Sequence, residues 1–537
     1  MNLPRIVIAG LSGGSGKTLV SLGVVRALAR SGLAVKPCKK GPDYIDAWWL
    51  ALAAGHPATN LDPYFLDAPM LRSLFWTQCG LAGDGARTDA APGPSWGEQP
   101  GLPGPSVPYD LAVIEGNRGL FDGRDLSGSS STAELARILG APVVVVMDCT
   151  KMTRTAAAIV SGLRHFEQGV HIAGVILNRT AGPRHRGVLR ETIEHYTDVP
   201  VLGILPKIAD NPIPERHMGL VSGMEHEACV AGLDRVADIM AEHVDLHRLR
   251  QVACAAPPPQ GPVANLWSLL PGAAHAAPEG PTPANADQGT DVPHAAPPLR
   301  PRIGYVHDAA LWFYYHENLL ALRHAGAELV RLSLLDDAEW PQLDGLYLGG
   351  GFPETLAAPL SANRPALDRL RALSESGLPI YAECGGFMVL GRSIVMDGIE
   401  HPMADIFPVR TVFHPKPQGL GYVDAAAVLE NPFHPVGATF RGHEFHYSRC
   451  VPCDAPSGTS GASGASEASG GAPSVPSALR LTAQSGHVTG MGDGRDGLLL
   501  RNTLAAYTHI FAPAVPHWAP AMVRAAREHR MARASKA

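Results

Sequence analysis

Short apolar segments alternate with segments of helical periodicity along both halves of the chain. The predicted strands are residues 5–9, 111–114, 142–147, 172–177, 303–306, 345–348 and 379–382. The predicted helices are 17–30 and 319–324. Such alternation predicts an α/β protein of two doubly wound domains, each built on a mostly parallel sheet.

Three stretches rich in small residues and proline interrupt this pattern, at 81–108, 255–300 and 454–478. None of them carries enough apolar surface to offset the entropy of ordering it, so we expect loops or linkers there. The longest lies near the middle of the chain and is predicted to join two domains. The predicted organisation is a first domain at 1–250 with an insertion at 81–108, a linker at 251–300, and a second domain at 301–530 with an insertion at 454–478.

Composition and charge narrow the class of protein. Hydrophobic residues make up 45% and charged residues 18% of the 537 residues, as in ordinary globular domains. The formal charge of −6 gives no bulk attraction to nucleic acid or to an anionic membrane, so neither is expected as a partner. No apolar run is long enough to span a bilayer, and the N-terminus does not read as a signal peptide. The eight cysteines follow no disulfide framework, so we expect a cytoplasmic protein with free thiols.

Residues 10–18 read GLSGGSGKT, directly after the first predicted strand and at the start of the first predicted helix. A helix N-terminus suits a phosphate, and glycines let the backbone wrap the anion. The lysine of such a loop reaches the terminal phosphates, and the threonine ligates Mg²⁺. The strict pattern has glycine at the position of Leu11, so this loop is a variant. The predicted ATP-binding residues are Gly13, Gly14, Ser15, Gly16, Lys17 and Thr18.

Acidic residues follow the predicted strands of the first domain. Asp43 and Asp46 lie in KKGPDYIDAWW, and Glu115 and Asp122 lie in VIEGNRGLFDG. Side chains at strand ends meet at the carboxyl edge of a parallel sheet, where ligands bind in such folds. Because Mg²⁺ is held by one or two carboxylates together with phosphates and water, some of these acids are expected to serve the nucleotide site. Spacing alone leaves open which of them do.

The segment LPIYAECGGFMVLG predicts a second site. A strand ends at Glu383, Cys384 occupies a sharp turn, and two glycines precede an apolar helix, which is the layout of a nucleophile elbow. A helix N-terminus lowers the pKa of a thiol, so a reactive thiolate is expected. The N–H of Gly385 can contribute to an oxyanion hole, and Gly350 is the candidate for a second donor.

A thiolate nucleophile requires a base that lies beside it in the folded chain. His509, in NTLAAYTHIF, is the best candidate, and His443, His446 and His517 remain alternatives on chemistry alone. His443 and His446 also have the residue types of a metal site, but RGHEFHYS offers no third ligand nearby. We therefore expect a binding role for that segment.

The motifs together resemble those of the cobyrinate a,c-diamide synthase family, within the group that includes cobyric acid synthase. The resemblance is carried by AGLSGGSGKT, KKGPDYIDAWW, NLDPYFL, VIEGNRGLFDG, VILNR, IPERHMGL, WFYYHENL, YLGGGFPE, YAECGGFMVLG, GLGYV, FRGHEFHYS and AAYTHIF, which span nearly the whole chain. PERHMGL and RGHEFHYS point to the a,c-diamide branch. The resemblance implies an N-terminal P-loop domain similar to dethiobiotin synthetase and a C-terminal class I glutamine amidotransferase domain.

The resemblance also implies a reaction at two sites. Cys384 would attack the side-chain amide of glutamine while His509 transfers protons, and the ammonia would pass to the ATP site. There Mg-ATP would phosphorylate a carboxylate of cobyrinic acid, and ammonia would convert the acyl phosphate to an amide, at side chains a and c in turn. The implied cofactor is Mg²⁺, with ATP and L-glutamine as co-substrates.

The resemblance further assigns roles to individual residues. The implied metal ligands are Thr18, Asp43 and Glu115, the substrate-activating groups Asp46 and Asp122, the adenine contact Asn178, and the macrocycle contacts His443 and Tyr447. Because the substrate would be a polycarboxylate, a locally basic site is expected. Its candidates are Lys36, Lys39 and Lys40.

One departure and several alternatives remain open. Phe511 stands two residues after His509, where many class I amidotransferases carry an orienting glutamate, so orientation must come from elsewhere. Hydrogenobyrinate and nickel-sirohydrochlorin are alternative substrates with the same motifs. A P-loop partitioning or metal-chaperone ATPase is an alternative of another class, although such proteins commonly carry an extra lysine where Leu11 and Ser12 stand. A homodimer is also possible.

Overall fold

The structure, a computed structural model, describes residues 2–82, 109–208, 213, 223–259, 261, 263–270, 300–336, 339–453, 475–484, 486–488 and 490–535. The chain divides into two compact units, Met1–Leu266 and Trp267–Ala537, and each is described by itself. Most of the three small-residue stretches, and the segment PERHMGL, lie outside the described residues. Among the residues described, no helix is both long and apolar enough to cross a membrane.

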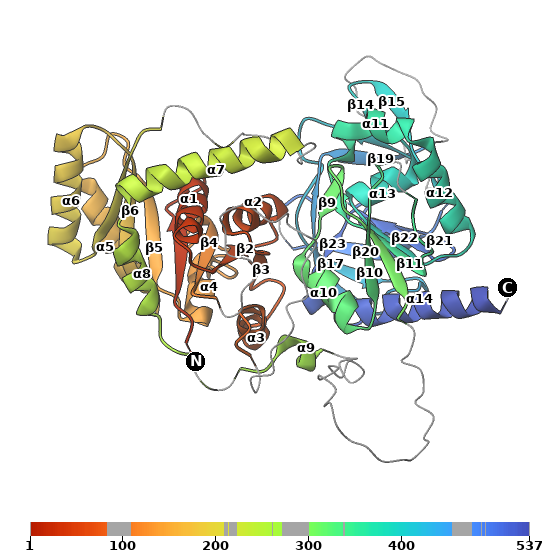
Figure 1. Cartoon of the computed structure of the whole chain (residues 1–537), viewed down its shortest axis with the longest axis horizontal. Helices are drawn as coiled ribbons and strands as arrows, with labels where there is room; N and C mark the ends of the chain where they lie inside the picture. The colour runs from red at the N-terminus through yellow and green to blue at the C-terminus, as the bar shows by residue number, and fades with distance from the viewer. Residues whose placement is uncertain are drawn as a thin grey trace, which may run out of the picture. The chain divides into compact units, whose positions relative to one another are not determined.

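The first unit is built on a seven-stranded parallel sheet with the order β3-β2-β4-β1-β5-β6-β7 (Figure 1). Its strands are β1 Arg5–Gly10, β2 Val35–Lys40, β3 Thr59–Leu61, β4 Leu111–Gly119, β5 Val143–Asp148, β6 Ile172–Thr180 and β7 Val201–Pro206. The strands β1 and β5 are buried almost throughout, as in a parallel sheet covered on both faces. The predicted α/β fold is confirmed for this unit.

Helices follow the strands in alternation. They are α1 Lys17–Arg30, α2 Tyr44–Ala54, α3 Ala68–Gln78, α4 Thr132–Leu139, α5 Thr155–Phe166, α6 Pro183–Thr197, α7 Gly223–His243 and α8 Leu246–Cys254. Helix α7 packs along α1 so closely that a Cβ atom at Gly23 would lie 2.4 Å from the Met240 side chain (Figure 1). Helices α2 and α4 begin where Asp43 and Ser131 accept hydrogen bonds from backbone N–H groups of the first turn. Because α1 follows β1 and α2 follows β2, both helices begin at the carboxyl edge of the sheet.

The second unit contains a ten-stranded sheet with the order β10-β8-β11-β13-β22-β21-β20-β17-β18-β23. The strands from β10 to β22 pair in parallel, and the remaining pairs are antiparallel. The prediction of a mostly parallel sheet is therefore correct for only half of this sheet. In the other half, three pairs join strands that are consecutive in sequence, β17 with β18, β20 with β21 and β21 with β22, without a helical crossover between them. Only antiparallel strands can be joined in this way.

The strands of this large sheet are β8 Arg302–Val306, β10 Glu328–Leu332, β11 Gly345–Leu348, β13 Ile380–Glu383, β17 Gly419–Ala427, β18 Thr439–His446, β20 Ser477–Ala483, β21 Arg495–Leu500, β22 Thr503–Ala506 and β23 His509–Ile510. Two smaller sheets contain β9 Leu311–Phe313 with β12 Gly350–Gly351, and β14 Gly391–Met396, β15 Ile399–Pro402, β16 Phe407–Phe413 and β19 Ser448–Pro452. The helices are α10 His316–His324, η2 Pro353–Leu356, α11 Ala357–Ala362, α12 Arg364–Glu375, α13 Gly385–Leu390, η3 Ala512–Ala514 and α14 Trp518–Ala534. A short helix, α9 Leu266–Leu269, falls at the boundary between the units and within the predicted linker.

Candidate functional site

The predicted phosphate loop joins the end of β1 to the start of α1, as the sequence predicts. Gly14 and Gly16 have φ angles of 76° and 91°, in the left-handed region that favours glycine. The Asn178 amide donates to the carbonyl of Ser15 at 3.0 Å, and a Cβ atom at Gly16 would lie 2.2 Å from that amide nitrogen. Asn178 therefore braces the loop backbone. The adenine contact predicted for it stays a prediction.

Four side chains form a lysine–acid cluster beside this loop: Thr18, Lys39, Asp46 and Glu115. The Lys39 ammonium lies 2.7 Å from an oxygen of Asp46 and 3.1 Å from one of Glu115. The Thr18 hydroxyl donates to the same Glu115 oxygen at 2.7 Å. Lys39 and Glu115 are fully buried, since their side chains are 1% and 0% exposed. The structure thus brings together the predicted Thr18, Asp46 and Glu115 around a lysine that the sequence suggested only as a general basic candidate.

The two carboxylates of the cluster differ in electrostatic state. Burial raises the pKa of Glu115 to about 7, against the opposing effect of the Lys39 ammonium. Burial acts to raise the pKa of Asp46 as well, but the charge and hydrogen bond of Lys39 outweigh it and lower that pKa. Burial first, and then the charge of Lys39, also lowers the pKa of Lys17. Asp46 is therefore the ionised partner of Lys39, whereas Glu115 holds a proton more readily.

The other predicted acids have local structural contacts. Asp43 caps α2 by accepting the N–H of Asp46 at 2.8 Å, and burial raises its pKa to about 6. Asp122 is exposed and accepts the N–H of Gly119 at 2.8 Å, at the turn after β4. The hydroxyl of Thr18 in contact with the Glu115 carboxylate offers Mg²⁺ the hard oxygen donors that it prefers.

Only one of the three candidate lysines joins the cluster. Lys36 is buried, and its ammonium donates to the carbonyl of Pro57 at 2.8 Å. Lys40 is also buried, and burial lowers its pKa, partly opposed by the charge of Asp62. The predicted basic site is thus represented within the cluster by Lys39.

The predicted nucleophile elbow is present in the second unit. Strand β13 ends at Glu383, Cys384 has a φ angle of 47°, and α13 begins at Gly385. The Cys384 N–H donates to the carbonyl of Ala506 at 2.7 Å, and its thiol lies 3.5 Å from the carbonyl of Phe445. The strained backbone at a non-glycine residue is what turns the thiol out of the strand.

The expected low thiol pKa is not what the structure supports. Burial raises the pKa of the Cys384 thiol well above its ordinary value, and the charge of Glu354 adds to this effect. The prediction considered only the turn of helix that follows the cysteine. Burial in the surrounding core and the carboxylate of Glu354 determine the direction of the pKa shift instead.

The predicted oxyanion glycines lie where no side chain fits. A Cβ atom at Gly385 would lie 2.9 Å from the backbone nitrogen of Gly351. A Cβ atom at Gly350 would lie 2.4 Å from Cε1 of His509. The loop 349–351 therefore packs against both the residue after the nucleophile and the predicted base. This is the arrangement that an oxyanion hole with donors from both segments needs.

His509 faces a carboxylate that the sequence analysis did not assign. Oε2 of Glu383 lies 3.4 Å from Nδ1 of His509, and both side chains are 0% exposed. The Ile510 N–H donates to Oε1 of Glu383 at 3.3 Å, and the Tyr347 hydroxyl donates to Oε2 at 3.2 Å. Asn318 in turn donates to the Tyr347 hydroxyl at 3.1 Å. Glu383, Cys384 and His509 are called the Cys–His–Glu group below.

The alternative histidines have other surroundings. His446 stacks on Tyr507, and its ring nitrogens lie within hydrogen-bond distance of the Ser448 carbonyl and the Glu444 carboxylate. His517 lies 3.0 Å from a ring nitrogen of His434.

His443 is buried and stacks on the ring of the predicted base His509, with ring centroids 4.9 Å apart. Burial lowers the pKa of His443 well below its ordinary value, so its ring is neutral. Tyr447 is half-buried and stacks on Phe413. In the described part of the chain, no group of three His, Cys, Asp or Glu side chains is placed to hold a metal ion. The macrocycle contacts predicted for His443 and Tyr447 stay predictions.

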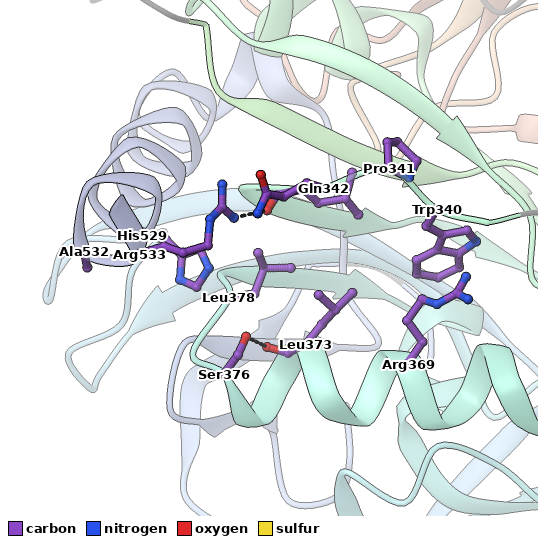
Figure 2. A pocket seen from close by; sticks show the side chains of 11 residues that line it. Trp340, Pro341, Gln342, Arg369, Leu373, Ser376, Leu378, His529, Ala532 and Arg533 are labelled. Carbon is purple, nitrogen blue, oxygen red and sulfur yellow. Dashed lines mark hydrogen bonds between the residues drawn. The ribbon is translucent and has the colours of Figure 1, made fainter. Parts of the chain in front are cut away.

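A surface hollow of roughly 580 Å³ in this unit lies apart from these residues (Figure 2). It is lined chiefly by Trp340, Gln342, Arg369, Leu373, His529 and Arg533. The Arg369 guanidinium lies over the Trp340 ring, 5.4 Å from the ring centroid. None of the Cys–His–Glu group lines this hollow, so it does not define the nucleophile's site.

The chain matches two family models, one in each unit. Residues 4–212 match an AAA domain, and residues 302–515 match a CobB/CobQ-like glutamine amidotransferase domain. Together with the phosphate loop and the elbow, they define an enzyme of the glutamine-dependent ligase class, with an ATP-using P-loop domain and an amidotransferase domain. The alternative of a partitioning or metal-chaperone ATPase is not supported.

Eight relatives that match 83% or more of this chain carry the name cobyrinate a,c-diamide synthase. The relative from Magnetococcus marinus is 38% identical, over 98% of this chain and 98% of its own length. The relative from Listeria innocua is 37% identical, over 83% of this chain and 87% of its own length. The relative from Methanosarcina barkeri is 33% identical, over 99% of this chain and 98% of its own length. The chain belongs to the cobyrinate a,c-diamide synthase family.

Proposed function

We propose that this chain uses ATP and glutamine to amidate the a and c carboxylates of cobyrinic acid, in cobalamin biosynthesis. The observation that carries the proposal is the presence of two chemically distinct sites in one chain. The lysine–acid cluster beside the phosphate loop suits phosphoryl transfer, and the Cys–His–Glu group suits hydrolysis of an amide. The relatives named cobyrinate a,c-diamide synthase match the chain across both.

At the amidotransferase site, the Cys384 thiol gives its proton to His509 and attacks the amide carbon of glutamine. The N–H groups of Gly350 and Gly385 stabilise the oxyanion, and His509 returns the proton to the leaving ammonia. Water then hydrolyses the glutamyl thioester, which releases glutamate and restores the thiol. Glu383, whose Oε2 lies 3.4 Å from Nδ1 of His509, stabilises the positive charge that the ring acquires.

At the synthetase site, a carboxylate of the substrate attacks the γ-phosphate of ATP, giving an acyl phosphate and ADP. Ammonia attacks the acyl carbon, and phosphate leaves. Lys17 neutralises charge on the transferred phosphoryl group, while Lys39 keeps Asp46 and Glu115 in place. Asp46, and Asp122 at the turn beside the loop, are the proposed substrate-activating groups.

Mg²⁺ would be held by Thr18 and Glu115, with Asp43 as the further candidate ligand. When bound, the ion neutralises charge on the phosphates. The direct contact between the Thr18 hydroxyl and the Glu115 carboxylate supports this assignment, because hydroxyl and carboxylate oxygens are its preferred ligands.

The test is to incubate the purified chain with Mg-ATP, glutamine and cobyrinic acid and to follow product mass, beside a Cys384→Ser variant. The wild type is expected to add two amides, and the variant to do so only with free ammonium. Glutamine hydrolysis without a change in cobyrinic acid would move the proposal to hydrogenobyrinate or nickel-sirohydrochlorin. No hydrolysis of glutamine with any of these tetrapyrroles would refute it.

The reaction as proposed requires no nucleic acid or membrane. A cytoplasmic location and a homodimer stay predictions. Light scattering on the purified chain during size-exclusion chromatography would test the dimer.

A further inference from the structure

Glu354 is a buried acid that the mechanism above does not use. It lies in η2, directly after the loop 349–351, and its side chain is 7% exposed. Pro353 beside it would lie 2.9 Å from a Cβ atom at Gly385, so this segment packs against the turn that follows the nucleophile. Phe352 contacts the ring of Phe445, whose carbonyl accepts the thiol of Cys384. The segment that carries this acid therefore packs beside the amidotransferase site, and the charge of Glu354 acts on the Cys384 thiol.

The Glu354 carboxylate lacks a counter-charge. Its Oε2 atom is buried without a hydrogen-bond partner among the residues described. It forms no ion pair with any described lysine, arginine or histidine, and no basic group contributes to its pKa, which burial raises to about 7. An isolated buried carboxylate is costly, and none of the residues that the structure describes offsets this one, so a cationic group on a ligand would stabilise it.

The substrate of this site carries one suitable group. L-glutamine has a neutral side-chain amide, which the thiol attacks, an α-carboxylate and a cationic α-ammonium. An acid beside the nucleophile repels the α-carboxylate and attracts the α-ammonium. We propose that Glu354 receives the α-ammonium of L-glutamine and so determines the substrate specificity of the amidotransferase site. This inference rests on the proposed function, because it requires glutamine at Cys384.

The pairing also has a consequence for the nucleophile. Of the charged groups that raise the pKa of the Cys384 thiol, Glu354 acts most strongly, followed by Glu383 and Glu444. When the substrate ammonium neutralises Glu354, that contribution disappears and the thiolate becomes more accessible. Glutamine binding would then promote attack by the thiolate on the bound glutamine. The charges of Glu383 and Glu444 would continue to raise the pKa of the thiol.

The test compares two substrates on the same preparation of enzyme. The second substrate is 4-carbamoylbutanoate, which is glutamine without its α-amino group. In the wild type, kcat/KM for glutamine is expected to exceed that for the analogue by about 100-fold or more, as for a buried charge pair. Glu354→Gln should reduce this preference to less than about tenfold, mainly through glutamine, and Glu354→Asp should retain part of it.

A ratio measured on one preparation is independent of the fraction that folds, so a destabilised variant still gives a result. Glu375→Gln, at an exposed position of α12, is the matched control and should leave the ratio unchanged. An unchanged ratio in Glu354→Gln would overturn the proposal. If the wild type hydrolysed neither amide, the proposed function itself would fail, which is a different result.

Alkylation of the thiol by iodoacetamide at pH 8 without glutamine gives a second readout. Glu354→Gln should accelerate alkylation of Cys384 by up to about tenfold, the effect of one pKa unit. A merely structural glutamate would not produce a weaker response to glutamine together with a more reactive thiol. No acceleration would show that Glu354 carries no charge beside the thiol, and would overturn the proposal.

Discussion

Glu383→Gln is the substitution that most directly tests the Cys–His–Glu group. The variant keeps the shape of the side chain and removes its negative charge. Oε2 of Glu383 lies 3.4 Å from Nδ1 of His509, and neither side chain is exposed. At that distance, two full charges interact by about 5 kcal/mol at an effective dielectric constant of 20. The His509 ring carries only part of a charge in the transition state. In the variant, the amide oxygen of the new side chain at position 383 can still accept a hydrogen bond from that ring.

We therefore expect a loss of about 2–3 kcal/mol of transition-state stabilisation, which corresponds to a fall of about 30- to 150-fold in kcat for glutamine hydrolysis. The KM for glutamine should change by less than about threefold, because Glu383 faces the base and not the substrate. Amidation driven by free ammonium does not use this group and should be unchanged.

The assay measures glutamate release and amide formation on the same preparation, with glutamine and then with ammonium as nitrogen source. Glu430→Gln, at an exposed position of the same unit, is the matched control. A Glu383→Gln variant that retains more than half of the wild-type kcat for glutamine hydrolysis would show that the contact does not assist the base. Parallel losses with both nitrogen sources would indicate a folding defect.

Three further predictions concern other parts of the chain. Lys39→Met leaves the acids of the lysine–acid cluster without their counter-charge, so urea unfolding should show a loss of about 3–5 kcal/mol, and an unchanged midpoint would refute the charge-balance argument. Gly350→Ala places a Cβ atom 2.4 Å from Cε1 of His509, so the rate of glutamine hydrolysis should fall by about 100-fold. Amidation driven by free ammonium should persist, and equal losses in both assays would contradict a local effect. Burial lowers the pKa of His434 from 6.5 to about 3, so the unfolded chain takes up a proton that the folded chain does not, and stability should fall as the pH drops from 6.5 toward 3. In that window, the free energy of unfolding measured by thermal melts should fall less steeply with pH in His434→Gln than in wild type, by about 1.4 kcal/mol per pH unit. Identical slopes of the free energy against pH would refute the assignment.

The elements next to the phosphate loop and the nucleophile could be predicted because local sequence determines them. The helix at 17–30 and the strand at 345–348 have the predicted bounds. The elbow at Cys384 follows from a buried strand, a turn and two small residues. The antiparallel half of the second sheet was missed, because pairing between strands depends on contacts that no local pattern records.

The electrostatics of the sites could not be predicted in the same way. The sign of the pKa shift at Cys384 depends on burial by the whole unit and on Glu354, which lies 30 positions earlier in the sequence. Glu383 was visible as an acid at the end of a buried strand, and Phe511 at the usual glutamate position indicated that another group must orient the base. Only the fold shows that the two observations concern the same histidine ring.

The two sites bury carboxylates in opposite ways, and the difference indicates where each site obtains its missing charge. Asp46 and Glu115 share Lys39, so the chain itself supplies their cation. Glu354 has no such partner among the described residues, and burial raises its pKa instead of a lysine lowering it. A built-in cation keeps the acids of the synthetase site in place before any substrate arrives. An acid without one makes the amidotransferase site depend on the charge that glutamine brings, so hydrolysis is favoured only when the correct amino acid is bound.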